Sequence, residues 1–179
     1  LHDYSFYGLH LVKLNLKGNS LELLSEHTFA GLEESMIEMD LSENKLERFP
    51  IIPLIKMDYL RSLRLSVNKI SSIPQDISIQ LQFNSLIFLD ISSNYLETLS
   101  SDYFRYFPHL KTLNLYNNYI ETVSKTCFYS VRDLQQLDMS HNDIIEIDSQ
   151  IFDTNKQLRI IDLSFNHIHY INGVFMLLP

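Results

Sequence analysis

Seven asparagines recur at nearly constant intervals, and this recurrence restricts the chain to a repeat architecture. Successive asparagines lie 25, 24, 26, 24, 24 and 24 residues apart. Each stands in the same frame, apolar-x-x-apolar-x-apolar-x-x-Asn-x-apolar, and seven matches in a row leave little room for chance. The seven positions are Asn19, Asn44, Asn68, Asn94, Asn118, Asn142 and Asn166.

The apolar positions of this frame predict a short strand with one buried face. The clearest copy holds Leu110, Leu113, Leu115, Asn118 and Ile120. Apolar residues at alternate positions are typical of a half-buried strand. One such strand cannot bury its face alone, whereas stacked copies pair in parallel and share a core. We therefore expect an α/β solenoid, an arc with a parallel concave β-sheet and an irregular or short-helical convex side.

The asparagine of each frame has a structural interpretation. Where the chain turns away from the sheet, it leaves inward N–H and C=O groups that cost about 1–3 kcal/mol each if buried without a partner. An asparagine side chain both donates and accepts hydrogen bonds, so it can satisfy these groups. We expect the seven asparagines to form a ladder along the core. A row of ligand-binding asparagines is the less favoured alternative.

The second half of each copy also repeats. An apolar residue is followed five positions later by phenylalanine, in Leu24/Phe29, Leu99/Phe104, Val123/Phe128 and Ile147/Phe152. This column predicts a spine of buried rings on the convex side. Leu1 and Phe6 fit the same half, so the chain begins within one copy, and it stops within another. Residues 1–179 are therefore expected to form a single array of about seven repeats of 24–26 residues, an internal segment of a longer array.

Composition excludes several classes of function. The chain carries 22 acidic and 14 basic residues, a net charge of −8. A nucleic-acid-binding protein usually carries a basic face, so no nucleic-acid partner is expected. No apolar run is long enough to span a bilayer, so this segment is not expected to insert into a membrane. The lone Cys127 cannot form an internal disulfide, and we expect a buried, inert thiol.

The residues that carry chemistry in enzymes do not form a recognisable set. His167 and His169 flank Ile168, and His141 lies one repeat earlier. They lack the His-Glu-x-x-His pattern and a cysteine pair, so surface histidines are favoured over a metal site. Nucleophile and phosphate-loop motifs are missing as well. We expect neither enzymatic activity nor a cofactor.

The repeat frame resembles the leucine-rich repeat family, in its 24-residue class. The segment Phe29-Ala-Gly-Leu-Glu-Glu-Ser-Met36 is similar to a Phe-x-Gly-Leu-Glu-x-Ser-Leu junction of chaoptin-like adhesion proteins. Arg48-Phe49-Pro50 and Leu60-Arg-Ser-Leu63 are similar to the same group. This resemblance implies a cell-surface adhesion molecule anchored by lipid. Toll-type receptor ectodomains, built from the same repeat, are the alternative.

The outward positions of the expected strands are the candidate binding surface. The central outward position holds Asn15, Asp40, Arg64, Asp90, Asn114, Asp138 and Asp162. Exposed aromatic residues are expected on or beside the sheet at Phe88, Tyr95, Tyr116, Tyr119 and Phe165. The hypothesis is one patch on repeats four to six, made of Asp90, Tyr95, Tyr116, Tyr119, Asp138 and His141. A solvated acidic row, and rings that pack on neighbouring repeats, are the alternatives.

Three functions remain open from the sequence. The favoured one is a protein-binding module for adhesion or recognition at the cell surface, with either a different protein or a second copy as partner. The second is a segment of a Toll-type signalling receptor ectodomain. The third is an intracellular scaffold, which the single cysteine and the absence of any Asn-x-Ser/Thr sequon among 13 asparagines keep open.

Overall fold

The computed structural model describes residues 1–75 and 82–170. Seven three-residue strands form one parallel sheet, and each occupies the predicted place in its repeat. In sheet order they are β1 (Lys13–Asn15), β2 (Glu38–Asp40), β3 (Ser62–Arg64), β4 (Phe88–Asp90), β6 (Thr112–Asn114), β8 (Gln136–Asp138) and β9 (Ile160–Asp162). The other elements are α1 (Ile51–Leu54), β5 (Thr98–Leu99) and β7 (Thr122–Val123).

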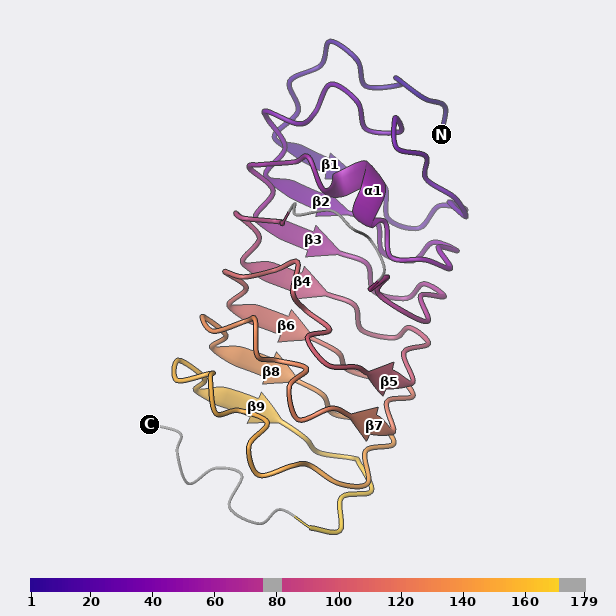
Figure 1. Ribbon diagram of the computed structural model, residues 1–179. Coiled ribbons are helices and arrows are strands. Elements are labelled where there is room, and N and C mark those ends of the chain that lie inside the picture. The colour runs from indigo at the N-terminus through magenta and orange to yellow at the C-terminus, as the bar shows by residue number, and fades with distance from the viewer. Residues whose placement is uncertain (76–81, 171–179) are drawn as a thin grey trace.

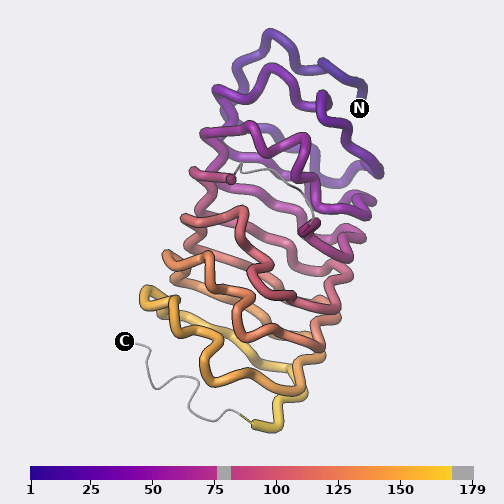
Figure 2. Tube along the Cα trace, viewed as in Figure 1, coloured from indigo at the N-terminus to yellow at the C-terminus, as the bar shows by residue number. Residues whose placement is uncertain are grey.

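The sheet confirms the expected solenoid. Its strands pair in strict register, so that Leu63, Leu89 and Leu113 lie side by side on β3, β4 and β6. All three are buried, and burying such a side chain stabilises the fold by about 1.5–3 kcal/mol. Successive turns of the chain stack along one axis (Figures 1 and 2). We call the solvent side of this sheet the sheet face.

The asparagines bind the turn that follows each strand to the turn before it. The amide of Asn94 donates to its own turn at the carbonyls of Ile91 (3.2 Å) and Ser92 (3.0 Å). It also donates to Leu65 O of the preceding repeat at 2.9 Å, and its Oδ1 accepts the N–H of Ile70 at 2.9 Å. The same four-bond pattern recurs at Asn44, Asn68, Asn118, Asn142 and Asn166.

The residue before each of these asparagines has a left-handed backbone. Its φ lies between 52° and 71° at Gly18, Glu43, Val67, Ser93, Asn117, His141 and Phe165. This conformation turns the N–H toward the next repeat, as when Val67 donates to Ser92 O at 3.0 Å. The bend is costly for a branched side chain such as valine. The ladder therefore imposes a backbone strain that the sequence frame alone does not reveal.

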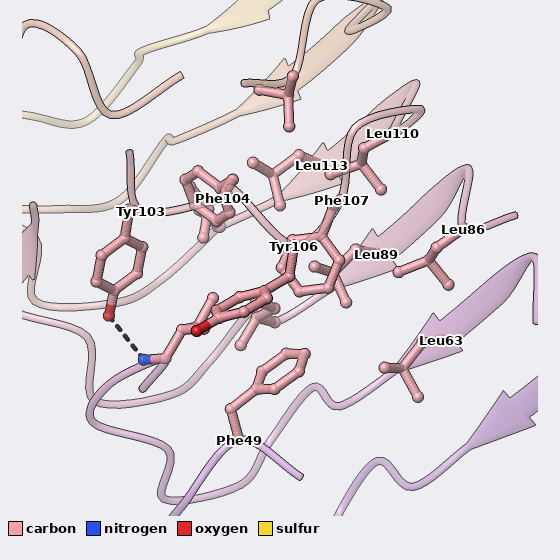
Figure 3. Packing of buried hydrophobic residues seen from close by; sticks show 14 of the residues in the cluster. Phe49, Leu63, Leu86, Leu89, Tyr103, Phe104, Tyr106, Phe107, Leu110 and Leu113 are labelled. Carbon is pink, nitrogen blue, oxygen red and sulfur yellow. Dashed lines mark hydrogen bonds between the residues drawn. The ribbon is translucent and has the colours of Figure 1, made fainter. Parts of the chain in front are cut away.

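Buried aromatic rings fill the other side of the solenoid. Phe104, Phe128 and Phe152 stack in one run with centroids 5.5 and 5.7 Å apart, and Phe6 and Phe29 stack at 5.9 Å. The predicted spine is thus present in two runs, which are separated by the repeats that hold α1 and residues 76–81. Figure 3 shows the rings between these runs: Phe49 and Tyr106 lie next to Phe107, which faces the leucines of the strands.

A second, two-stranded parallel sheet joins β5 to β7, which the sequence analysis did not anticipate. The two strands are extended by a backbone hydrogen bond from the N–H of Ser124 to Leu99 O at 2.8 Å. Ser124 is the sixth residue after its ladder asparagine, and Pro50 and Pro74 hold this position in earlier repeats. Proline has no N–H to donate. The two prolines therefore remove the N–H that would pair the second repeat with the first and the third repeat with the second in this way.

One polar residue interrupts the buried column of the convex side. Asn155 lies three positions after Phe152, where other repeats carry an apolar residue such as Val131. It is fully buried, and its amide donates to Phe128 O at 3.2 Å and Val131 O at 2.7 Å. Asn155 therefore connects two repeats on the convex side, as the ladder asparagines do beside the sheet.

Replacing Asn94 by alanine is expected to lower the free energy of unfolding by about 3–5 kcal/mol, because it leaves several buried backbone groups without partners. Asn19→Ala is the matched control. Asn19 is exposed and donates only within its own turn, to Leu16 O and Lys17 O. Its loss should cost under about 1 kcal/mol. Urea unfolding measures both, and equal losses would contradict the ladder's role.

Replacing Val67 by asparagine is expected to stabilise the protein by about 1 kcal/mol, because asparagine tolerates the left-handed backbone better. Asn117 already occupies the equivalent position. The control is Val12→Asn, since Val12 is similarly exposed but lacks a positive φ. Thermal unfolding should show a higher midpoint for the first variant alone. A gain from both would point to lost surface hydrophobicity instead.

Candidate interaction surface

The central outward row of the sheet face is a line of polar side chains in register. Asp40, Arg64, Asp90, Asn114 and Asp138 lie side by side on neighbouring strands. Parallel pairing of the strands fixes this alignment, so each repeat contributes one side chain to the row. The structure thus brings the predicted Asp90 and Asp138 into one row, two strands apart.

The acidic members of this row have a structural task. Asp90 Oδ1 accepts the N–H of Ser92 at 3.0 Å, and Asp138 Oδ1 accepts the N–H of Ser140 at 2.9 Å. The same bond is made at Asn15, Asp40, Asn114 and Asp162. Short acceptor side chains commonly support a turn two residues ahead in this way. The row's composition therefore follows from turn formation, whatever else it binds.

Arg64 is the exception in the row. Its guanidinium carbon lies 4.9 Å from the centroid of the Phe88 ring, and its Nη1 donates to Ser62 Oγ at 3.2 Å. A cation over an aromatic face is favourable and covers apolar surface. Phe88 is consequently half-buried rather than exposed as expected. Its ring is partly covered within the sheet face.

Two carboxylates of the sheet face titrate below their ordinary range. The Lys13 ammonium, 2.9 Å from Glu38, lowers the pKa of that carboxyl. At the other end, hydrogen bonds from the Oγ and N–H of Ser164 lower the pKa of Asp162. Both groups are exposed, so solvent screens these effects. These two carboxylates therefore stay ionised to lower pH than ordinary ones do.

The exposed rings make two separate sets of ring contacts, and the single patch that the sequence predicts includes residues of both. Tyr95 and Tyr119 contact each other with centroids 5.9 Å apart. Tyr116 meets His141 edge-on at 5.0 Å, and His141 stacks on Phe165 at 4.2 Å. Tyr95 and Tyr119 directly follow a ladder asparagine, whereas the other three residues precede one. The two clusters therefore start from different parts of the ladder turn, one after the asparagine and the other before it.

Glutamates that the sequence analysis did not single out lie beside the Tyr95–Tyr119 pair. Glu97 and Glu121 each come two residues after a tyrosine of the pair, and both are exposed. The N–H of Glu121 donates to Glu97 O at 3.0 Å, so the two glutamates lie in one row on adjacent repeats. Their position, three residues after the ladder asparagine, was readable from the repeat alignment.

The histidines and the cysteine do not form a chemical centre in residues 1–75 and 82–170. No group of three His, Cys, Asp or Glu side chains there can hold a metal ion. His167 lies 3.6 Å from Asp143 beside a hollow of about 510 Å³ that Glu121 and His169 also line. Cys127 is buried as expected, and burial raises its pKa, so a reactive thiolate does not form. Over these same residues, no helix has the length and apolar character that a membrane span requires.

Comparison with known sequences identifies the repeat. Residues 84–144 match a family model described as leucine rich repeat. Over 103 residues the chain is 33% identical to chaoptin of Drosophila melanogaster. That match covers 58% of this chain and 7% of chaoptin, so the chain spans a small part of this relative.

Solved structures share the fold over nearly all of the chain. Toll in a complex with Spatzle, from Drosophila, is 24% identical with a TM-score of 0.83, covering 97% of this chain and 25% of Toll. TLR13 in a complex with ssRNA13 is 26% identical with a TM-score of 0.71, and the match covers 93% of this chain and 27% of TLR13. A leucine-rich repeat protein of Leptospira interrogans is 23% identical with a TM-score of 0.70, and the match covers 90% of this chain and 45% of that protein.

Replacing Ser164 by alanine is expected to raise the pKa of Asp162 toward that of an ordinary aspartate, because the hydroxyl hydrogen bond is the main cause of the low value. NMR titration of the carboxyl carbon measures it. A folded-state pKa below the unfolded one stabilises the protein above the unfolded pKa, and this contribution is lost as pH falls through the folded pKa. An unchanged titration midpoint in the variant would refute this origin.

Proposed function

We propose that this chain, a leucine-rich repeat protein of the chaoptin and Toll type, is a protein-binding module for adhesion or recognition at the cell surface. The observation that carries the proposal is the set of exposed rings on repeats four to seven. Tyr95 and Tyr119 are 47% and 56% exposed, and Phe165 is 74% exposed. Rings exposed to this extent cost solubility and are enriched at interfaces.

The rings are arranged as binding anchors rather than as isolated side chains. His141 lies between Tyr116 and Phe165 and contacts both rings. Side chains that already rest on one another lose less conformational freedom when a partner covers them. Their backbones are fixed by the ladder, as in the 3.0 Å bond from Tyr119 N to Leu96 O. A rigid support of this kind favours recognition of a defined partner surface.

The partner we propose is a protein, either a different one or a second copy of this chain. TLR13 is solved with RNA, but the net charge of −8 and the row that includes Asp90 and Asp138 disfavour a polyanion here. We propose no enzymatic activity and no cofactor for this segment, because its exposed residues form a binding surface without a converging set of acid, base and nucleophile. Adhesion is favoured over signalling because the segment Phe29–Met36 is similar to a junction of chaoptin-like adhesion proteins, and chaoptin is 33% identical over 58% of this chain.

Replacing both Tyr116 and Tyr119 by alanine is expected to reduce binding at least about tenfold, because buried tyrosines commonly contribute about 2 kcal/mol each to an interface. Beads coated with the chain would be tested for clustering with one another and for attachment to cultured cells. Clustering reports a second copy as partner, and attachment reports a different protein.

The matched control replaces Tyr59 and Tyr129, which are 56% and 51% exposed but lie outside the sheet face. This variant should bind like the unsubstituted chain. Thermal unfolding of both variants establishes that each is folded. Undiminished binding by a folded Tyr116→Ala/Tyr119→Ala variant, or equal losses from the two pairs, would overturn the proposal.

A further inference from the structure

Two rows of side chains, at the first and third positions after the ladder asparagines, form a continuous surface in repeats four to six. Tyr95, Tyr119 and Asp143 are the residues after successive ladder asparagines, and each donates its N–H to the preceding repeat at 2.9–3.0 Å. Glu97 and Glu121 form the parallel row two residues further on. These five exposed residues are called the edge patch.

The edge patch combines aromatic faces with negative charge. Its two tyrosines already contact each other at 5.9 Å. Glu97 and Glu121 make no ion pair with any residue among 1–75 and 82–170. Aromatic faces attract cations, and nearby carboxylates strengthen that attraction. The patch therefore offers two kinds of group that favour the same sign of charge in a partner.

The same rows are different in the first repeats. Lys45 occupies the position of Tyr95 and Tyr119, and it lies 3.9 Å from Glu22 of the glutamate row. Glu47 occupies the next place in that row and is followed by Arg48. Acidic groups there are accompanied by basic ones from the chain itself. In the edge patch Asp143 lies 3.6 Å from His167, but Glu97 and Glu121 have no such neighbour among residues 1–75 and 82–170, so a bound partner would have to supply the cations for these two glutamates.

We propose that the edge patch binds a basic protein segment, whose lysine or arginine side chains lie against the Tyr95–Tyr119 pair and reach Glu97, Glu121 and Asp143. The inference rests on the proposed function, because it names the chemistry of the partner that such a module would recognise. It assigns this role to the Tyr95–Tyr119 pair, whose repeats carry Glu97 and Glu121 two residues further on.

The test uses a fluorescein-labelled peptide of alternating arginine and serine, with a glutamine-for-arginine peptide as the neutral probe. Fluorescence anisotropy measures the affinity of the whole chain for each, at low and at high salt. We expect the neutral peptide to bind at least about tenfold more weakly, and affinity for the arginine peptide to fall as salt rises. Equal affinity for both peptides would overturn the proposal.

Site-specific variants separate the patch from general attraction to an acidic chain. Glu97→Gln/Glu121→Gln should weaken arginine-peptide binding about fivefold or more, and Tyr95→Ala/Tyr119→Ala should weaken it similarly at unchanged net charge. The matched control, Glu22→Gln/Glu47→Gln, removes the same charge from the same row and should change affinity less than about twofold. Equal losses from the two glutamate pairs would overturn the assignment.

The outcome is separable from that of the bead experiment. Bead binding that depends on Tyr119 without any affinity for the arginine peptide would overturn this inference and leave the proposed function standing. Bead clustering that Glu97→Gln/Glu121→Gln abolishes, again without peptide binding, would assign the patch to a second copy and likewise overturn it. Peptide binding with the expected variant pattern, in a chain whose beads bind nothing, would support the patch and contradict the adhesion function.

Discussion

A single set of hydrogen bonds, repeated at the six ladder asparagines from Asn44 to Asn166, supports the rest of the molecule. The side chain closes its own turn and holds the turn before it, so neighbouring repeats are joined by side chains as well as by strands. Without these bonds the buried carbonyls and N–H groups beside the sheet would have no partner. The strand register, the left-handed residue before each asparagine and the rows of outward side chains all depend on this arrangement.

The sheet was predictable because its determinants are local and repeat. The frame around Leu113 and Leu115 specifies a strand, and seven copies specify how the strands stack. The second sheet was harder to predict, because part of its extent is limited by residues that lack an N–H, Pro50 and Pro74, and not by a recurring pattern. The backbone strain at Val67 could not be predicted from its residue type either. Its left-handed backbone follows from the ladder geometry and conflicts with its own preference.

The sequence predicted which residues of the candidate binding surface are exposed, but it did not predict which of them contact one another. Alignment of the repeats places Tyr95, Tyr116 and Tyr119 at exposed sites, as the structure shows. Tyr95 and Tyr119 follow a ladder asparagine and contact each other, whereas Tyr116 precedes one and contacts His141. Phe88 was misjudged because Arg64 covers it, an interaction across two strands that no single repeat encodes. The acidic row follows from turn formation, so its composition alone does not identify a binding site.

The nearest-neighbour character of the ladder also determines how the molecule responds to force. Each asparagine bonds only within its own repeat and the one before it, so no bond described here ties distant repeats together. A load applied along the stack would be distributed over many similar junctions, each of which can yield slightly. An array built in this way is expected to extend by small displacements at many junctions instead of breaking at one.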